Sequence, residues 1–276
     1  MKIPKKLVFL RFSSLGDVAI SVPLIRCFLS KYPEISITFV TKKNFIPLLY
    51  EFKELDILEF DSTGRHKGFN GIWALYKEIK ELNPIGIVDL HGSLRTNILR
   101  LFFSFSSISF KKINKGRIEK KALTRKNNKI LVPLTPTIHR YGDVLRKIGF
   151  PIDLSDHEFP VKFITPEKFN DSFFNSKLKW IGIAPFAKHE GKVYPLDLTQ
   201  KLISFLQKDN QVFLFGADGY EASKLEIWER AYFNVCSLAG KYLLFDQIKI
   251  ISNLDIMISM DSANGHIATN YNIPVI

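Results

Sequence analysis

Cysteine is scarce in this sequence. Only Cys27 and Cys236 occur in 276 residues, and they lie far apart along the chain. Such a pair provides neither a disulfide framework nor the close ligand spacing of a zinc site. We therefore expect a protein of a reducing compartment, the cytoplasm, without disulfide bonds.

Long hydrophobic runs are also absent. The longest candidate, residues 98–110, is interrupted by Arg100 and four serines, whereas roughly 18 apolar residues are needed to cross a bilayer. The apolar run at residues 7–10 is too short for a signal-peptide core and has no small-residue cleavage site after it. The sequence therefore predicts neither a membrane span nor a secretory leader.

Signatures of common cofactors and of repeat proteins are missing as well. No Gly-x-Gly-x-x-Gly fingerprint occurs, which disfavours a nicotinamide cofactor. There is no internal repeat of the roughly 20–50 residues that marks a solenoid. Hydrophobic residues make up 46% of the chain and charged residues 24%, which is typical of a packed globular protein and not of a disordered one.

Positive charge is abundant but unevenly distributed. The formal net charge is +12, and residues 111–129 hold nine lysines and arginines against one acid, Glu119. A segment of this density attracts anionic partners, and a solvated surface that favours solubility is an equally open interpretation. No aromatic side chain interleaves these cations, so we do not expect a nucleic-acid-binding protein.

The first half of the chain alternates between short apolar runs and longer amphipathic segments. This alternation implies right-handed βαβ crossovers and a parallel, doubly wound sheet. We predict one α/β domain over residues 1–150. Its expected strands are 6–12, 35–40, 57–60 and 86–90, and its expected helices are 18–31, 45–52, 69–82, 94–103 and 137–148.

A second alternation follows a break in the pattern. Residues 151–179 are rich in Pro, Asp and Ser, as expected of a linker, and we predict a second α/β domain over residues 180–276. Residues 273–276 resemble the start of a buried strand, so we expect a further strand and a closing helix to follow. The other expected strands are 180–184, 211–215, 235–238 and 255–259, and the expected helices are 196–207, 220–231 and 243–252.

The first predicted strand ends in a turn that can face a ligand. Ser13, Ser14 and Gly16 leave backbone N–H groups free where a helix begins, and the helix dipole favours anions there. Asp17 stands at the same helix start. Two roles remain open for Asp17: a helix cap, or a general base that takes a proton from an attacking hydroxyl.

A similar strand-to-helix turn lies at residues 259–266. Its backbone N–H groups and the Ser262 hydroxyl are suited to the diphosphate of a nucleotide. The structural alternative is an ordinary cap formed by Asp261 or Ser262, with His266 packed inside the helix.

Two more loops contain candidate donor-binding residues. Lys188 and Lys192 lie in the loop 184–195, where one lysine can neutralise the charge that builds on a departing diphosphate. Glu221 follows another strand end, where a carboxylate can bond to ribose hydroxyls. Capping of the helix there by Asp218 is the alternative.

One first-domain turn is a candidate for contact with a second substrate. His91, Gly92 and Arg95 follow the strand predicted at 86–90, at the edge where doubly wound sheets bind ligands. A buried structural role for His91 is equally open.

Together these segments resemble glycosyltransferase family 9, the heptosyltransferase-like enzymes of lipopolysaccharide core assembly. The resemblance implies the GT-B type of α/β fold, in which two Rossmann-like domains with parallel sheets face each other across a cleft. Four stretches carry it in the family's order along nearly the whole chain: Ser-Ser-Leu-Gly-Asp at 13–17, Asp-Leu-His-Gly at 89–92, Lys-Val-Tyr-Pro at 192–195 and Met-Asp-Ser-Ala-Asn-Gly-His at 260–266.

The resemblance also implies roles for individual residues. Asp17 matches the catalytic base of an inverting, metal-independent transfer, and Lys192 matches a lysine that contacts the donor phosphate. Neither a metal ion nor a further cofactor is implied. The residues expected on the donor are Ser13, Ser14, Gly16, Lys188, Glu221, Asp261, Ser262, Ala263, Asn264 and His266, and those expected on the acceptor side are His91, Gly92 and Arg95.

The substrates follow from the same resemblance. The typical donor is ADP-heptose, and the expected acceptor is lipopolysaccharide or its lipid A-core part. Residues 111–129 are then expected to meet anionic lipid headgroups at the inner face of the inner membrane, or an acidic core sugar. The alternative is a non-catalytic nucleotide- or glycan-binding protein of the same fold, against which the retained Asp17 carboxylate argues.

Overall fold

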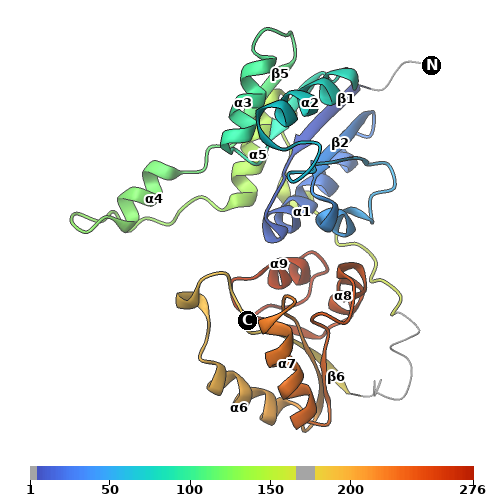
Figure 1. Cartoon of the computed structure of the whole chain (residues 1–276), viewed down its shortest axis with the longest axis vertical. Helices are drawn as coiled ribbons and strands as arrows, with labels where there is room; N and C mark the ends of the chain where they lie inside the picture. Colours follow the sequence, from blue (N-terminus) through green and yellow to red (C-terminus); the bar gives the residue numbers. More distant parts are fainter. Residues whose placement is uncertain (1–4, 166–177) are drawn as a thin grey trace. The chain divides into compact units, whose positions relative to one another are not determined.

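The chain folds into two compact units. The computed structural model describes residues 5–165 and 178–276 (Figure 1). Unit 1 is Met1–Glu158 and unit 2 is Phe159–Ile276. Each unit contains one parallel β-sheet with helices packed on it, so the predicted α/β class is confirmed.

Unit 1 is built on a five-stranded sheet in the order β3-β2-β1-β4-β5, and every pair is parallel. The chain winds outward from β1 to β3 and then returns to place β4 on the other side of β1. The carboxyl ends of β1 and β4 therefore flank the switch point where doubly wound sheets bind ligands. The strands are β1 (Lys5–Leu10), β2 (Ile35–Thr41), β3 (Asp56–Glu59), β4 (Gly86–Asp89) and β5 (Ser109–Lys112).

Helices cover both faces of this sheet because successive β1 side chains point to opposite faces. Val8 and Leu10 join a buried cluster with Leu75 of α2 and Leu99 of α3. Phe9 meets Phe28 of α1 edge-on, with ring centroids 5.6 Å apart. The helices are α1 (Leu15–Lys31), α2 (Gly68–Glu81), α3 (Leu94–Phe103), α4 (Arg117–Thr124) and α5 (Thr137–Ile148), with short 3₁₀ helices η1 (Lys43–Leu49) and η2 (Leu154–Asp156).

Unit 2 repeats the architecture with a four-stranded parallel sheet in the order β8-β7-β6-β9. Its core joins Ile183 of β6 and Leu214 of β7 to Ile203 of α6 and Trp228 of α7. The elements are β6 (Lys179–Ala184), η4 (Glu190–Lys192), α6 (Leu196–Leu206), β7 (Asn210–Leu214), α7 (Tyr220–Ala231), β8 (Val235–Ser237), α8 (Leu244–Ile251), β9 (Ile256–Ser259) and α9 (Ala263–Thr269).

Most predicted elements are confirmed. The helices expected at 94–103, 137–148 and 220–231 coincide with α3, α5 and α7. The helix expected at 45–52 is wrong in type, because η1 is a 3₁₀ helix that contains Pro47. Proline lacks the N–H of an i→i−4 hydrogen bond, which weakens an α-helix of only seven residues, whereas the 17-residue α1 accommodates Pro23.

The cationic segment contains two elements that the pattern did not predict. β5 is short, and two of its four residues are lysines, so no apolar run marks it. α4 has no buried residue, so no hydrophobic periodicity reveals it.

The predicted linker lies partly outside the described residues, which omit 166–177. Its described part contacts each unit separately. The Pro151 carbonyl accepts a hydrogen bond from the Tyr32 hydroxyl at 2.8 Å in unit 1, and the Phe163 ring lies 5.3 Å from that of Phe245 in unit 2. The domain boundaries at 150 and 180 stay a prediction.

Residues 274–276 continue the sheet of unit 2 beyond β9. The Met257 N–H donates to the Pro274 carbonyl and the Ile276 N–H to the Met257 carbonyl, both at 2.9 Å. A single parallel bridge joins Met257 to Val275.

Candidate functional site

Two strand-end turns meet at the carboxyl edge of the unit 1 sheet. Leu10 of β1 stands opposite Asp89 of β4, and the Leu90 N–H donates to the Leu10 carbonyl at 3.1 Å. The motifs at 13–17 and 89–92, distant in sequence, therefore start from neighbouring points of one sheet.

Asp17 lies in the first turn of α1, whose N-cap is Ser14. The Asp17 Oδ2 atom accepts hydrogen bonds from the Ser14 N–H at 3.1 Å and from the Ser14 hydroxyl at 2.8 Å. The carboxylate thereby satisfies a backbone N–H at the helix start, so the capping role is confirmed. The peptide bond between Ser13 and Ser14 is cis.

Arg11 forms a salt bridge with the same carboxylate. Arg11 is only 6% exposed, and a buried guanidinium requires an opposite charge. Its Nη1 donates to the Leu90 carbonyl at 2.6 Å, and the guanidinium lies 5.9 Å from the centre of the Tyr141 ring of α5. These contacts fix Arg11, which in turn fixes Asp17 at the sheet edge.

Opposing effects act on the pKa of Asp17. Partial burial raises this pKa, whereas the Arg11 charge and the hydrogen bonds from Ser14 lower it. The net pKa is below the ordinary value for an aspartate. Since 34% of its side chain is exposed, Asp17 is an ionised proton acceptor at neutral pH that a ligand can reach.

The turn after β4 is organised by Asp89. Its Oδ1 accepts hydrogen bonds from the backbone N–H groups of His91 at 2.9 Å and Gly92 at 2.8 Å. Gly92 has a φ of +54°, and a Cβ atom there would lie 2.9 Å from the Cγ2 of Ile113. Glycine is therefore required both by the backbone and by the close approach of Ile113, the residue after β5.

His91 is buried beneath this turn, with its ring centre 5.0 Å from that of Phe12. Burial, followed by the charges of Arg11 and Lys115, lowers the pKa of His91 to about 4. The imidazole is therefore neutral at neutral pH. Arg95, by contrast, lies exposed at the start of α3 and does not line the pocket beside the turn.

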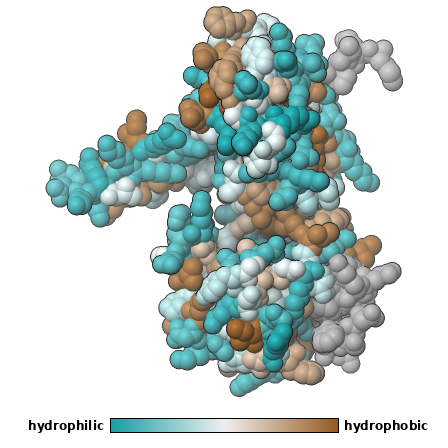
Figure 2. Space-filling view, viewed as in Figure 1, coloured by the Kyte–Doolittle hydropathy of each residue, from teal (hydrophilic) through white to brown (hydrophobic). Residues whose placement is uncertain are grey.

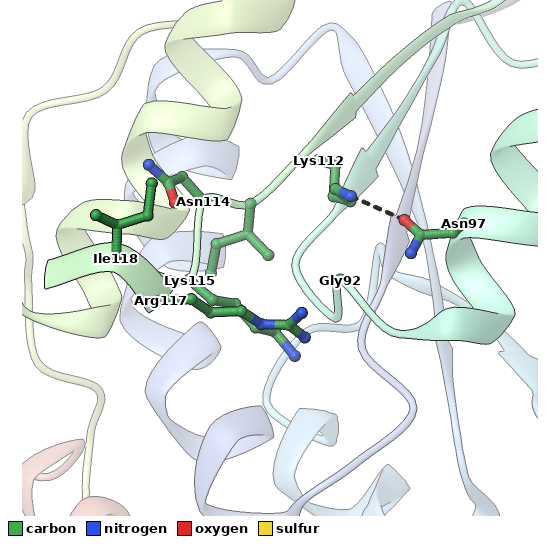
Figure 3. Close-up of a pocket in the computed structure, with 8 residues that line it drawn as sticks. Gly92, Asn97, Lys112, Asn114, Lys115, Arg117 and Ile118 are labelled. Atoms are coloured by element: carbon green, nitrogen blue, oxygen red, sulfur yellow. Dashed lines mark hydrogen bonds between the residues drawn. The ribbon is translucent and has the colours of Figure 1, made fainter. Parts of the chain in front are cut away.

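A pocket of about 420 Å³ opens beside Gly92 (Figure 3). Figure 3 shows the side chains of Lys115 and Arg117 extending in the same direction, toward Gly92. Lys112 is held on another wall, where its Nζ donates to the Asn97 Oδ1 at 2.8 Å. The lining residues are Gly92, Asn97, Lys112, Ile113, Asn114, Lys115, Arg117 and Ile118.

This pocket carries an excess of positive charge. Its lining includes Lys112, Lys115 and Arg117 but no carboxylate. Burial lowers the pKa of Lys115, as do the neighbouring charges of Arg11 and Arg117. These cations repel one another, and a bound anion would offset that repulsion. The pocket is therefore complementary to an anionic group.

In unit 2, the loop after β6 and the turn after β9 come together. Ala184 pairs with Ser259 where the two strands end, and Lys192 forms a salt bridge with Asp261. The hydrogen bond from Lys192 lowers the pKa of Asp261. Both side chains are about half exposed, at 51% and 55%, so an incoming anion can compete for the ammonium group.

The N-cap of α9 is Ser262, whose side chain makes no cap hydrogen bond. The Ser262 hydroxyl instead bonds to the Ser259 hydroxyl at 2.9 Å, so Ser262 stands at the cap position of the structural alternative but does not cap the helix through its side chain. Ala263, Asn264 and His266 are partly exposed along α9. The predicted role of these residues in donor binding stays a prediction.

The remaining donor-side candidates lie at two other loops of unit 2. Glu221 accepts a hydrogen bond from the Ala217 N–H at 2.7 Å. The N-cap of α7 is Gly219, and no side chain caps the helix, so the alternative role of Asp218 as the cap is wrong. Lys188 lies exposed in the loop after β6.

Three residues of the unit 1 site were not predicted from sequence as part of it. The signal for Arg11 is a charged residue directly after a buried apolar strand, since such a charge needs a partner. Lys115 stands in the cationic segment, but only β5 places it at the sheet edge. Tyr141 has the helical spacing of a core residue and no other signal.

Cys27 and Cys236 are both free cysteines. Within ranges 5–165 and 178–276, no three His, Cys, Asp or Glu side chains are grouped to hold a metal ion. No helix in these ranges is long and apolar enough to span a bilayer.

Known proteins resemble this chain in sequence. The family model of glycosyltransferase family 9 (heptosyltransferase) matches residues 72–276. The lipopolysaccharide core heptosyltransferase OpsX of Haemophilus influenzae is 24% identical to the chain, over 99% of this chain and 78% of OpsX.

Solved structures resemble it in fold. A glycosyltransferase family 9 protein from Veillonella parvula matches with a TM-score of 0.77 and 16% identity, over 100% of this chain and 81% of that one. E. coli heptosyltransferase WaaC, solved with ADP, matches with a TM-score of 0.69 and 14% identity, over 98% and 86%. The structure of WaaC with ADP-2-deoxy-2-fluoro heptose matches with a TM-score of 0.68.

Proposed function

The chain belongs to glycosyltransferase family 9, and from this membership we propose that it transfers heptose from ADP-heptose to a lipopolysaccharide core acceptor. We further propose that the transfer inverts the anomeric carbon and needs no metal ion. The observation that carries the proposal is the ionised, partly exposed Asp17 carboxylate at the switch point of the unit 1 sheet. OpsX, named as a core heptosyltransferase, supports the acceptor class, and WaaC with bound ADP-2-deoxy-2-fluoro heptose supports the donor.

Asp17 is the proposed general base. The acceptor hydroxyl oxygen bonds to the anomeric carbon of the donor while the bond from that carbon to the diphosphate breaks. The hydroxyl proton passes to Asp17, and the departing electron pair stays on the diphosphate of ADP. A direct displacement of this kind inverts the configuration at the anomeric carbon.

We propose that the Lys192 ammonium group stabilises the negative charge that develops on the departing diphosphate. Its ammonium group is paired with Asp261 through an accessible salt bridge, which a more highly charged diphosphate can replace. A preorganised cation at the developing charge stabilises the transition state. Because Lys192 supplies this charge, the proposed reaction requires no metal ion.

The remaining donor contacts are assigned to both units. Ser262, Ala263, Asn264 and His266 share the turn and helix that follow Asp261, so we assign them to the nucleotide together with Lys188 and Glu221. Ser13, Ser14 and Gly16 precede Asp17 and are assigned to the donor as well.

The cationic pocket of unit 1 is the proposed site for an anionic group of the acceptor. Lys112, Lys115 and Arg117 line it beside Gly92, close to the turn that contains His91. Arg95 is assigned to the outer part of the acceptor side, since it lies exposed on α3. An acidic or phosphorylated core sugar has the charge that these cations favour.

The proposed donor and the two cysteine thiols indicate the cellular compartment in which the proposed reaction takes place. We assign the reaction to the cytoplasm, in agreement with two free cysteines.

Product analysis tests the proposal directly. Full-length protein is incubated with ADP-heptose and a lipid A-core acceptor, with and without EDTA, and the product is examined by mass spectrometry and NMR. The proposal predicts one added heptose of inverted anomeric configuration, in equal yield with the chelator. Tight binding of ADP-heptose without any product would instead favour a non-catalytic binding protein.

A further inference from the structure

A basic arm extends from unit 1 between β5 and α5. The arm comprises residues 117–135, that is, α4 and the chain that returns from it, and Figure 1 shows α4 standing away from the unit 1 sheet. No residue of the arm is buried. α4 has only eight residues, whereas isolated helices shorter than roughly 12–15 residues are marginal in water.

The arm is nevertheless an ordered hairpin. The Ile130 N–H donates to the Ala122 carbonyl at 3.0 Å, which ties the returning chain to α4. At the tip, the Arg125 Nε donates to the Asn128 carbonyl at 2.5 Å. The side chains are therefore presented on a defined scaffold.

Several large aliphatic side chains of the arm are exposed. Ile118 is 84% exposed, Leu131 78% and Val132 61%. Figure 2 shows hydrophobic side chains standing among hydrophilic ones on this projection. Since unit 1 does not bury them, a partner surface that does so gains the hydrophobic free energy.

The arm is also strongly cationic. It holds six lysines and arginines against Glu119 alone, at positions 117, 120, 121, 125, 126 and 129. Among the salt bridges between described residues, none includes one of these six side chains. The partner must therefore combine negative charge with an apolar layer.

We propose that the arm docks on an anionic lipid bilayer, with its cations at the headgroups and its aliphatic side chains at the headgroup–acyl boundary. Short amphipathic segments with this composition bind membranes in this way. A nucleic acid satisfies the cations but not Ile118 and Leu131, because it binds exposed side chains mainly by stacking on aromatic rings. This inference does not rest on the sugar-transfer reaction.

Sedimentation of the full chain with lipid vesicles tests the proposal. The protein binds phosphatidylcholine vesicles that contain about one-third phosphatidylglycerol, and it binds pure phosphatidylcholine far more weakly. Binding to the anionic vesicles decreases as salt is raised, because salt screens the headgroup charge.

Charge reversal in the arm gives the first matched comparison. The variant K120E/K121E/K126E/K129E loses at least about a hundredfold in vesicle affinity, since each cation contributes about fivefold. The control K43E/K53E/K77E/K208E has the same net charge but changes exposed lysines outside the arm, and it keeps most of the affinity. Equal losses in both variants would reduce the effect to net charge and overturn the proposal.

The aliphatic side chains give the second comparison. I118S/L131S keeps every charge and lowers vesicle affinity by about tenfold or more, while binding to random oligonucleotides stays as in the wild type. Unchanged vesicle affinity in this variant, or oligonucleotide binding that exceeds vesicle binding, would overturn the proposal. Thermal unfolding stays as in the wild type in all variants because the substituted side chains are exposed.

Discussion

The Arg11 guanidinium forms a salt bridge with the Asp17 carboxylate across the turn between β1 and α1. The cation is buried and is further held by the Leu90 carbonyl. Partial burial raises the pKa of Asp17, but the Arg11 charge and the hydrogen bonds from Ser14 together outweigh this effect and lower the pKa. The proposed base is thus oriented and ionised before any substrate binds.

A carboxylate of lowered pKa is a weak base toward a free hydroxyl. It becomes effective as the new bond to the anomeric carbon forms, because the attacking oxygen then grows more acidic. Proton transfer to Asp17 is therefore expected late in the displacement. Most of the transition-state stabilisation must then come from Lys192, which neutralises the charge on the departing diphosphate.

Removal of the Lys192 ammonium group tests whether Lys192 stabilises the departing diphosphate. Lys192→Ala is expected to lower kcat by about 10²–10³-fold, as the loss of one stabilising group at a developing charge does. Affinity for ADP falls as well, which calorimetry measures. Lys201→Ala, at an exposed position of α6, serves as the control; a Lys192 variant as active as this control would contradict the assigned role.

Neutralising two cations of the unit 1 pocket is expected to change KM for the acceptor and not KM for the donor. Lys115→Met with Arg117→Met raises KM for a phosphorylated or acidic acceptor by about tenfold or more, since hydrogen bonds to charged groups contribute about 1.5–3 kcal/mol each. KM for ADP-heptose stays unchanged in initial-rate measurements. Arg100→Met, on exposed α3 surface, is the matched control, and a rise confined to the donor KM would remove the pocket from the acceptor side.

His91 is expected to make stability depend on pH. Its pKa is lowered to about 4 in the folded chain, from 6.5, so the unfolded chain binds more protons between these values and stability falls as pH falls through that window. Between pH 7 and pH 5 this group alone should cost about 2 kcal/mol. Urea unfolding at both pH values, compared between wild type and His91→Gln, isolates the effect; equal pH dependence in both would show that His91 is not responsible.

Sequence patterns predicted those parts of the fold in which burial is periodic. α3, α5 and α7 were found at their observed limits because one face of each is apolar. α4 was missed because none of its residues is buried. β5 was missed because half of its short span is lysine, which gives no apolar run.

The candidate site was predicted as motifs rather than as contacts. Strand ends and small residues pointed to Asp17 and Asp261, since these features depend on local sequence. The salt bridges from Arg11 to Asp17 and from Lys192 to Asp261 depend on where neighbouring strands end. The cationic pocket depends on β5, so the predicted anion-binding segment could not be divided into pocket and arm until the fold was known.

The isosteric variant Asp17→Asn tests whether Asp17 is the general base. We would measure the rate of heptose transfer and the affinity for ADP side by side, with Asp143→Asn, a half-exposed carboxylate of α5, as the control. Asp17→Asn is expected to keep its affinity for ADP but to lose about 10²–10⁴-fold in kcat, the usual contribution of a general base. Transfer by Asp17→Asn at close to the rate of the control would contradict the assignment of Asp17 as the general base.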